Sequence, residues 1–189
     1  MFQGWEAFYT LVGTASAALI SLLFVVATLT SGREMPDSNR GTNIYMSPTV
    51  FHFAVVLVVS ATALAPRLQA PLVELAVAVC ALSGFGQMLV IGLQFGRRGF
   101  PSSPHWSDFW CYAAAPALLY LALGAMAAAL RFEPRVGVYG LGLVLLTLML
   151  TAIRNAWDLV TFLAPRAPRY GGTDLRAGDP GYESDDTSG

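Results

Sequence analysis

Long apolar runs separated by short polar connections dominate this chain. Residues 5–30, 49–65, 68–95, 109–130 and 138–163 are each almost entirely apolar. A helix needs about 20 apolar residues to cross the hydrocarbon core of a bilayer, and all but the second run reach that length. We therefore predict an all-α fold, in which residues 1–164 form a polytopic membrane helical bundle of about five transmembrane helices.

The second run is the shortest, and only Pro66 and Arg67 separate it from the third. So short a connection predicts a tight hairpin between the two helices. A re-entrant second segment, which enters the membrane and leaves on the same side, is the alternative.

Polar side chains recur at helical spacing inside the last run. A helix turns about 100° per residue, so steps of three and four residues place them on one face. They are Thr147, Thr151, Arg154, Asn155, Asp158 and Thr161. Ionisable groups at membrane depth usually face a bundle interior or a wet cavity, because a charge in hydrocarbon is costly. This face is therefore predicted to line a polar pathway or a contact between helices.

Two interpretations of Arg154 and Asp158 stay open. They are four residues apart and can pair along the helix, as part of a gate, an ion or proton pathway, or a polar lock. Alternatively, Trp157 marks the inner interface, Arg154 extends to the lipid headgroups and Asp158 is already in water. Thr147 and Thr151 lie deeper and favour a packed polar seam, although threonine can also bond the backbone of its own helix.

The first run carries a second face of small and hydroxyl residues. Its members are Glu6, Thr10, Thr14, Ala17, Ser21 and Thr28, with Gly13 beside them. Small residues at four-residue spacing let helices approach closely, so close packing is the expected use and a pore-lining face the alternative. Glu6 and Glu74 are both expected near the outer surface, where they would form an acidic mouth attractive to cations. Gly92 and Gly96 predict one more close helix contact.

Composition and charge add an orientation. The 189 residues are 55% hydrophobic and 12% charged, with a formal net charge of -1, and all the basic residues are arginine. More of these arginines lie in the connection after the first run, in the connection after the third and in the tail than on the opposite side. The positive-inside rule then places the amino terminus outside and the carboxyl terminus in the cytoplasm. Residues 165–189, rich in Pro, Gly and acidic residues, are predicted to be a disordered cytoplasmic tail.

No motif for catalysis or cofactor binding is present. The chain has no Gly-x-Ser-x-Gly elbow, no Walker loop, no His/Cys cluster with metal-ligand spacing and no basic face for nucleic acid. We therefore expect no catalytic residue, cofactor, metal or nucleic-acid partner. A membrane-embedded enzyme is the third interpretation of the chain. Its side chains would come from His52, His105, Asp108, Arg154 and Asp158, which are all predicted near one side of the membrane.

Residues 8–26 read Phe-Tyr-Thr-Leu-Val-Gly-Thr-Ala-Ser-Ala-Ala-Leu-Ile-Ser-Leu-Leu-Phe-Val-Val. The Val-Gly, Ala-Ala-Leu and Leu-Phe-Val pattern resembles the first helix of small multi-spanning proteins of the bacterial inner membrane. The resemblance covers one run of the five, and Ser21 stands where those proteins have glycine. It implies a multi-pass protein of the bacterial inner (plasma) membrane. It implies no reaction, since that group has no assigned activity.

Two functions fit these features. In the first, several copies form a homo-oligomer whose polar faces on the first and last helices line a channel-like route for an ion or small solute. Arg154 and Asp158 would form its inner constriction, and Glu6 and Glu74 its outer mouth. In the second, the chain is a non-catalytic accessory or assembly subunit that docks these faces against a larger membrane complex. We favour the first, because 189 residues leave little interior in which to hide two polar faces.

Overall fold

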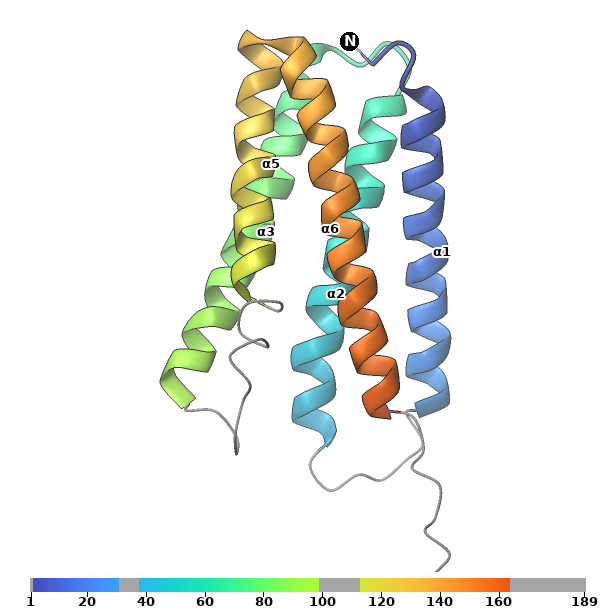
Figure 1. Ribbon diagram of the computed structural model, residues 1–189, viewed down its shortest axis with the longest axis vertical. Helices are drawn as coiled ribbons and strands as arrows, with labels where there is room; N and C mark the ends of the chain where they lie inside the picture. The colour runs from blue at the N-terminus through green and yellow to red at the C-terminus, as the bar shows by residue number, and fades with distance from the viewer. Residues whose placement is uncertain (1, 31–37, 99–112, 164–189) are drawn as a thin grey trace, which may run out of the picture.

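The computed structural model describes residues 2–30, 38–98 and 113–163. These residues form five helices that run back and forth along one long axis (Figure 1). They are α1 (Glu6–Thr30), α2 (Ser38–Leu64), α3 (Ala70–Arg98), α5 (Ala115–Phe132) and α6 (Pro134–Leu163). The predicted helical bundle is therefore confirmed. The predicted tail, together with His105 and Asp108, lies outside the described residues.

The helices are those of a membrane protein by length and composition. Within the described part of the chain, α1, α3, α5 and α6 are long and apolar enough to cross a membrane, whereas the apolar part of α2, Pro48–Leu64, is shorter. The helix α2 itself begins at Ser38, well before the predicted start at Thr49. Hydropathy marks only the apolar part of a helix, and backbone hydrogen bonding continues through the polar residues that precede it.

The helix α6 lies at the centre of the packing. It contacts α1, α2 and α5, while α5 also packs on α3 and α2 also packs on α1 and α3. Half of the apolar window of α6 is buried inside the bundle, compared with 22% for α1 and for α3. The last helix therefore combines the largest share of core with the polar face that the sequence singles out.

Two tight turns close the same end of the bundle. The predicted hairpin between the second and third runs is confirmed, with Arg67 in its turn at a φ of 59°, a left-handed conformation that residues other than glycine seldom adopt. At the other turn only Glu133 separates α5 from α6. A Cβ on Gly137 would lie 2.6 Å from the backbone nitrogen of Leu130, so α5 and α6 touch backbone to backbone beside this turn.

Apolar side chains both fill the interior of the bundle and cover its outer surface. The largest buried cluster includes Tyr9, Val56, Val77, Leu123 and Leu145, one from each helix. Large apolar side chains are also exposed on every helix, among them Leu11, Val58, Leu82, Leu121 and Leu143. A helix that is apolar all round suits hydrocarbon on the outside better than water.

Candidate functional site

The polar face of α6 divides between the surface and the interior. Thr147, Arg154 and Asp158 are exposed, Thr151 is half-buried, and Asn155 is 1% exposed. Asn155 is turned by about 100° from Arg154 around the helix, toward the core. Most of the predicted face therefore lies on the outside of the single chain, and Asn155 alone among its members is fully buried.

The threonines of this face bond their own helix. The Thr147 hydroxyl donates to the Leu143 carbonyl at 2.8 Å, and the Thr151 hydroxyl donates to the Thr147 carbonyl at 2.8 Å. Thr161 does the same with the Trp157 carbonyl at 3.0 Å. These hydroxyl protons are satisfied whatever lies outside the helix, because an acceptor one turn back is always present.

The polar face of α1 is also on the outside. Thr10, Thr14 and Ser21 are exposed, and the Ser21 hydroxyl donates to the Ala17 carbonyl at 3.0 Å. The helix contact inside the chain is made beside this face, where a Cβ on Gly13 would lie 3.1 Å from the Ser60 Cβ of α2. Whether the exposed face contacts another helix stays a prediction.

Each polar face is turned away from the contact between α1 and α6. The contact between α1 and α6 passes through Gly142, where an added Cβ would lie 3.2 Å from the Phe8 ring. From Gly142, Thr147 and Arg154 are rotated about 120–140° around α6, and from Phe8, Thr14 is rotated about 120° around α1. Within one chain these faces therefore do not line a common route.

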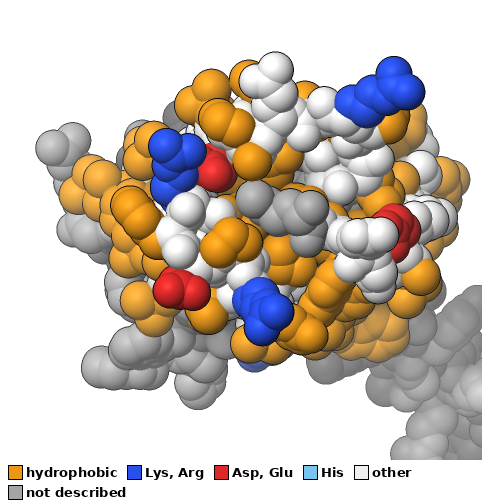
Figure 2. Space-filling model, turned by 90° about the horizontal axis from the view of Figure 1, so that it is seen from above, with side chains coloured by type: hydrophobic (Ala, Val, Ile, Leu, Met, Phe, Trp, Pro, Cys, Tyr) orange, Lys and Arg blue, Asp and Glu red, His pale blue; other side chains and the backbone are white. Residues whose placement is uncertain are grey.

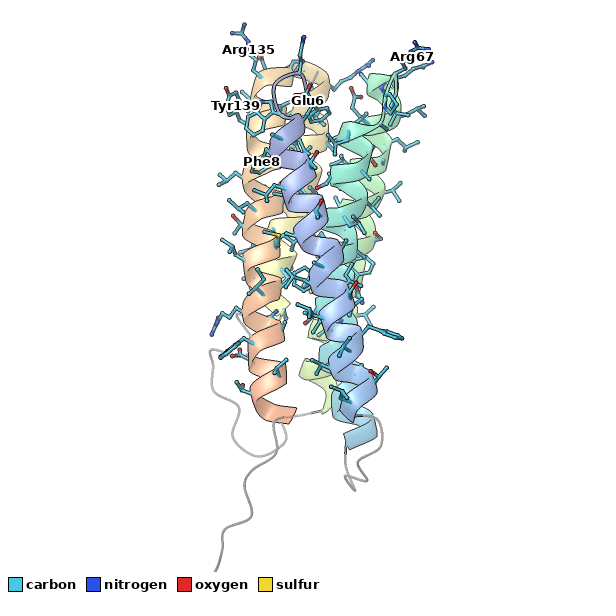
Figure 3. The ribbon with its side chains drawn as sticks, turned by 90° about the vertical axis from the view of Figure 1, so that its right-hand side faces the viewer. Glu6, Phe8, Arg67, Arg135 and Tyr139 are labelled. Carbon is cyan, nitrogen blue, oxygen red and sulfur yellow. The ribbon has the colours of Figure 1, made fainter. Side chains whose placement is uncertain are left out.

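The end of the bundle that holds the two turns mixes acidic and basic side chains. Figure 2 shows them scattered around the rim among hydrophobic side chains. Glu6 and Arg67 line one hollow there, of about 460 Å³, with Phe2, Gln3 and Thr62 among its other walls. In Figure 3, Glu6 lies between Arg67 and Arg135.

The predicted acidic mouth is thus less acidic than the sequence indicates, because Arg67 shares the hollow with Glu6. Glu74 is half-buried in the first turns of α3 and does not line this hollow. Attraction of cations by Glu6 and Glu74 stays a prediction.

A buried histidine and tyrosine form the most distinctive polar contact of the described residues. His52 on α2 is 0% exposed and Tyr120 on α5 is 1% exposed. The His52 Nδ1 and the Tyr120 hydroxyl are 2.7 Å apart. Gly84 of α3 makes room for this pair, since a Cβ there would run into the Tyr120 ring. The pair therefore joins three helices in the interior of the bundle.

Several buried polar atoms have no hydrogen-bond partner in the described structure. They are His52 Nε2, Asn155 Oδ1, Gln87 Oε1, Ser16 Oγ and Ser60 Oγ. An unpaired polar atom away from water costs free energy, so such atoms are rare unless something binds there. His52 and Asn155 lie close in sequence to Phe53 and Ala152, which belong to one buried cluster shared by α2 and α6.

The residues proposed for an enzyme differ in burial. His52 is buried in the interior, whereas Arg154 and Asp158 are exposed on α6. Among the described residues, no group of three or more His, Cys, Asp and Glu side chains is placed to hold a metal ion.

Sequence reasoning named His52 but missed its partner. Tyr120 lies in an apolar run without any motif around it, and its distance from His52 along the chain hides the pairing. The chemistry of histidine was the one indication of a partner, because histidine is rare at membrane depth and is usually paired with a polar group.

No protein-family model matches the chain, and no curated protein or solved structure matches it significantly. The functional argument therefore rests on the geometry described above.

Proposed function

We propose that the protein is a channel-like or transport protein for an ion or small solute, assembled from several copies of the chain. The polar faces of α1 and α6 would line the route between copies. The observation that carries this proposal is the placement of both faces on the outside of one chain, each turned away from the contact between α1 and α6. A contact that joins two different faces of identical subunits repeats from copy to copy, and it closes into a ring when the rotation between neighbouring copies divides a full turn.

The depths of the two faces support this assembly. The helices α1 and α6 run in the same direction, and Phe8 lies beside Gly142. Each residue advances a helix by about 1.5 Å, so Thr14 and Thr147 lie at nearly equal depth. Copies inserted in the same orientation would bring these threonines level with each other across the interface.

Cross-linking between two differently tagged copies tests the assembly. In a background with Cys80 and Cys111 replaced by alanine, one copy carries Thr14→Cys and the other Thr147→Cys. We expect a disulfide-linked heterodimer in native membranes. The control pairs Thr14→Cys with Asp158→Cys, which lies about 15 Å away in depth, and should give little product. Equal yields from both pairs, or none from either, would contradict the proposed interface.

Flux measurements test the passage itself. In the proposal, Arg154 and Asp158 form the inner constriction, with Glu6 and Glu74 at the outer mouth. In reconstituted vesicles that conduct potassium, chloride or glycerol, Arg154→Ala and Asp158→Asn should change the rate or the selectivity. Ile153→Val, at an exposed apolar position next to Arg154, is the control. Unchanged flux in both polar variants would rule out this constriction.

The accessory subunit remains the second proposal, because the same exposed faces would also fit a foreign membrane protein. Mass measurement of the particle extracted into lipid nanodiscs separates the two. A multiple of 20.2 kDa favours the homo-oligomer. A larger partner at fixed stoichiometry favours the accessory role. A membrane-embedded enzyme is the third proposal, and the burial of His52 against the exposure of Arg154 and Asp158 does not favour it.

We also propose that the chain sits in a bacterial inner membrane with its amino terminus outside and its carboxyl terminus in the cytoplasm, and that α2 is a fifth crossing. The excess of arginine on the side of the tail supports this orientation. Support for the crossing comes from the length of α2, whose 27 residues extend about 40 Å.

A further inference from the structure

The His52–Tyr120 pair has a defined direction of hydrogen bonding. A buried phenol proton needs an acceptor, and the Tyr120 oxygen lies 2.7 Å from His52 Nδ1. If Nδ1 carried the proton instead, the phenol proton would be left without this acceptor. Tyr120 therefore donates to Nδ1, and the ring proton of the neutral His52 is on Nε2. This makes the unpartnered Nε2 a buried donor.

An unpartnered acceptor lies on the facing helix. Asn155 is 1% exposed, and its Oδ1 has no partner within the described structure. It is one turn beyond Ala152, which belongs to the same buried cluster as Phe53, the residue next to His52. The helices α2 and α6 run in opposite directions (Figure 1), so Asn155, one turn past Ala152, lies slightly nearer than His52 to the end at which α2 begins.

The side chains also lean toward the same region. Helical side chains tilt toward the amino terminus of their own helix. His52 on α2 and Tyr120 on α5 therefore lean toward the end where these two helices begin, while Asn155, which lies slightly nearer that end, leans back toward them. Gln87, one turn beyond Gly84 on α3, supplies a second unpartnered acceptor on a helix that packs against Tyr120.

We propose that His52, Tyr120 and Asn155 form a buried hydration site, in which water accepts a proton from His52 Nε2 and donates one to Asn155 Oδ1. Each of the two atoms lacks a partner, and they do not bond each other. A bridging molecule must accept from one and donate to the other, which water does at the smallest volume. All these groups belong to one chain, so the site does not depend on the assembly proposed above.

Hydroxyl-radical footprinting by X-ray radiolysis tests this site in the full chain in lipid nanodiscs. Radicals formed from bound water oxidise the side chains beside it. Tyr120 should be oxidised several-fold faster than Tyr9, although both are buried, at 1% and 0% exposure. Tyr9 is an internal control because it is equally buried and its hydroxyl donates to the Val138 carbonyl, not to a group beside the proposed water. Oxidation of Tyr120 no faster than that of Tyr9 would mean a dry interior and would overturn the proposal.

Two variants locate the water. Asn155→Leu removes the acceptor at similar volume and should lower the oxidation of Tyr120 toward that of Tyr9. Ser60→Ala removes another unpartnered buried hydroxyl, two turns along α2 from His52, and should leave Tyr120 oxidation unchanged. Oxidation of Tyr120 that stays high in Asn155→Leu would overturn the placement of water between His52 and Asn155. The comparison of Tyr120 with Tyr9 in the unaltered chain decides the proposal even if Asn155→Leu does not fold.

Discussion

Gly84 is the residue that lets the buried His52–Tyr120 pair form. A Cβ at this position would run into three atoms of the Tyr120 ring. The ring cannot easily move aside, because its hydroxyl is bonded to His52 at 2.7 Å. The sequence shows Gly84 only as one glycine among 18, and nothing local in it reveals that an aromatic ring occupies the place of a side chain.

We therefore expect Gly84→Ala to destabilise the bundle by about 1–3 kcal/mol, the usual cost of an extra methyl group in a packed core. Gly86→Ala is the matched control, since a Cβ on Gly86 meets nothing within 4 Å. The free energy of unfolding is measured by SDS titration in mixed micelles. A loss of the same size in both variants would show that helix propensity, and not the Tyr120 contact, sets the cost.

Tyr120→Phe should cost about 1 kcal/mol, because it leaves His52 Nδ1 without its donor in a buried place. A double-mutant cycle with His52→Phe should give a coupling energy of the same order. Tyr9→Phe is the control. Its hydroxyl donates to the Val138 carbonyl at 3.4 Å, a longer and weaker bond. A Tyr120→Phe cost no larger than that of Tyr9→Phe, without coupling to His52, would contradict the assigned role of the pair.

At the scale of the elements, glycines set how closely neighbouring helices approach each other. The sequence alone does not indicate which glycines lie at these contacts. The Gly92-xxx-Gly96 pattern predicts a close contact, yet a Cβ on Gly92 meets nothing within 4 Å. The close approaches are instead at Gly13, Gly84, Gly137, Gly140 and Gly142. A glycine pattern indicates that one face of a helix carries small side chains. Whether another helix packs on that face depends on the angle at which the two helices cross.

The turn between α5 and α6 gives a prediction at this scale. Gly137→Ala should destabilise the pair by about 1–3 kcal/mol or more, because its Cβ would lie 2.6 Å from the Leu130 backbone nitrogen, which cannot yield. Gly140→Ala should be tolerated, since its Cβ meets the side chain of Met126, which is flexible and can turn away. Thermal unfolding followed by circular dichroism compares them. The opposite order of stability would contradict the packing of this hairpin.

At the scale of the whole molecule, the five helices of the described residues alternate in direction, so the first and the last run the same way. The start of α1 and the end of α6 lie at opposite ends of the bundle (Figure 1). If α2 crosses fully, the termini lie on opposite sides of the membrane. If α2 is re-entrant, four crossings leave both termini on the same side.

Labelling of single cysteines with a membrane-impermeant maleimide distinguishes these topologies. In the background with Cys80 and Cys111 replaced by alanine, Gln69→Cys in the α2–α3 turn and Gln3→Cys should both be labelled from outside intact cells. Ser184→Cys in the tail should be labelled only after lysis. Labelling of Ser184→Cys in intact cells would contradict the proposed orientation.

The sequence by itself determined the class of protein, because the length and apolar character of its runs depend on local composition alone. It also determined the helical periodicity that placed Thr147, Arg154 and Asp158 on one face. Only the tertiary structure decided which way that face points, that Asn155 turns inward from it, and that Tyr120 reaches His52. These outcomes depend on how each helix is rotated against its neighbours, and that rotation is set by the packing of residues far apart in the chain.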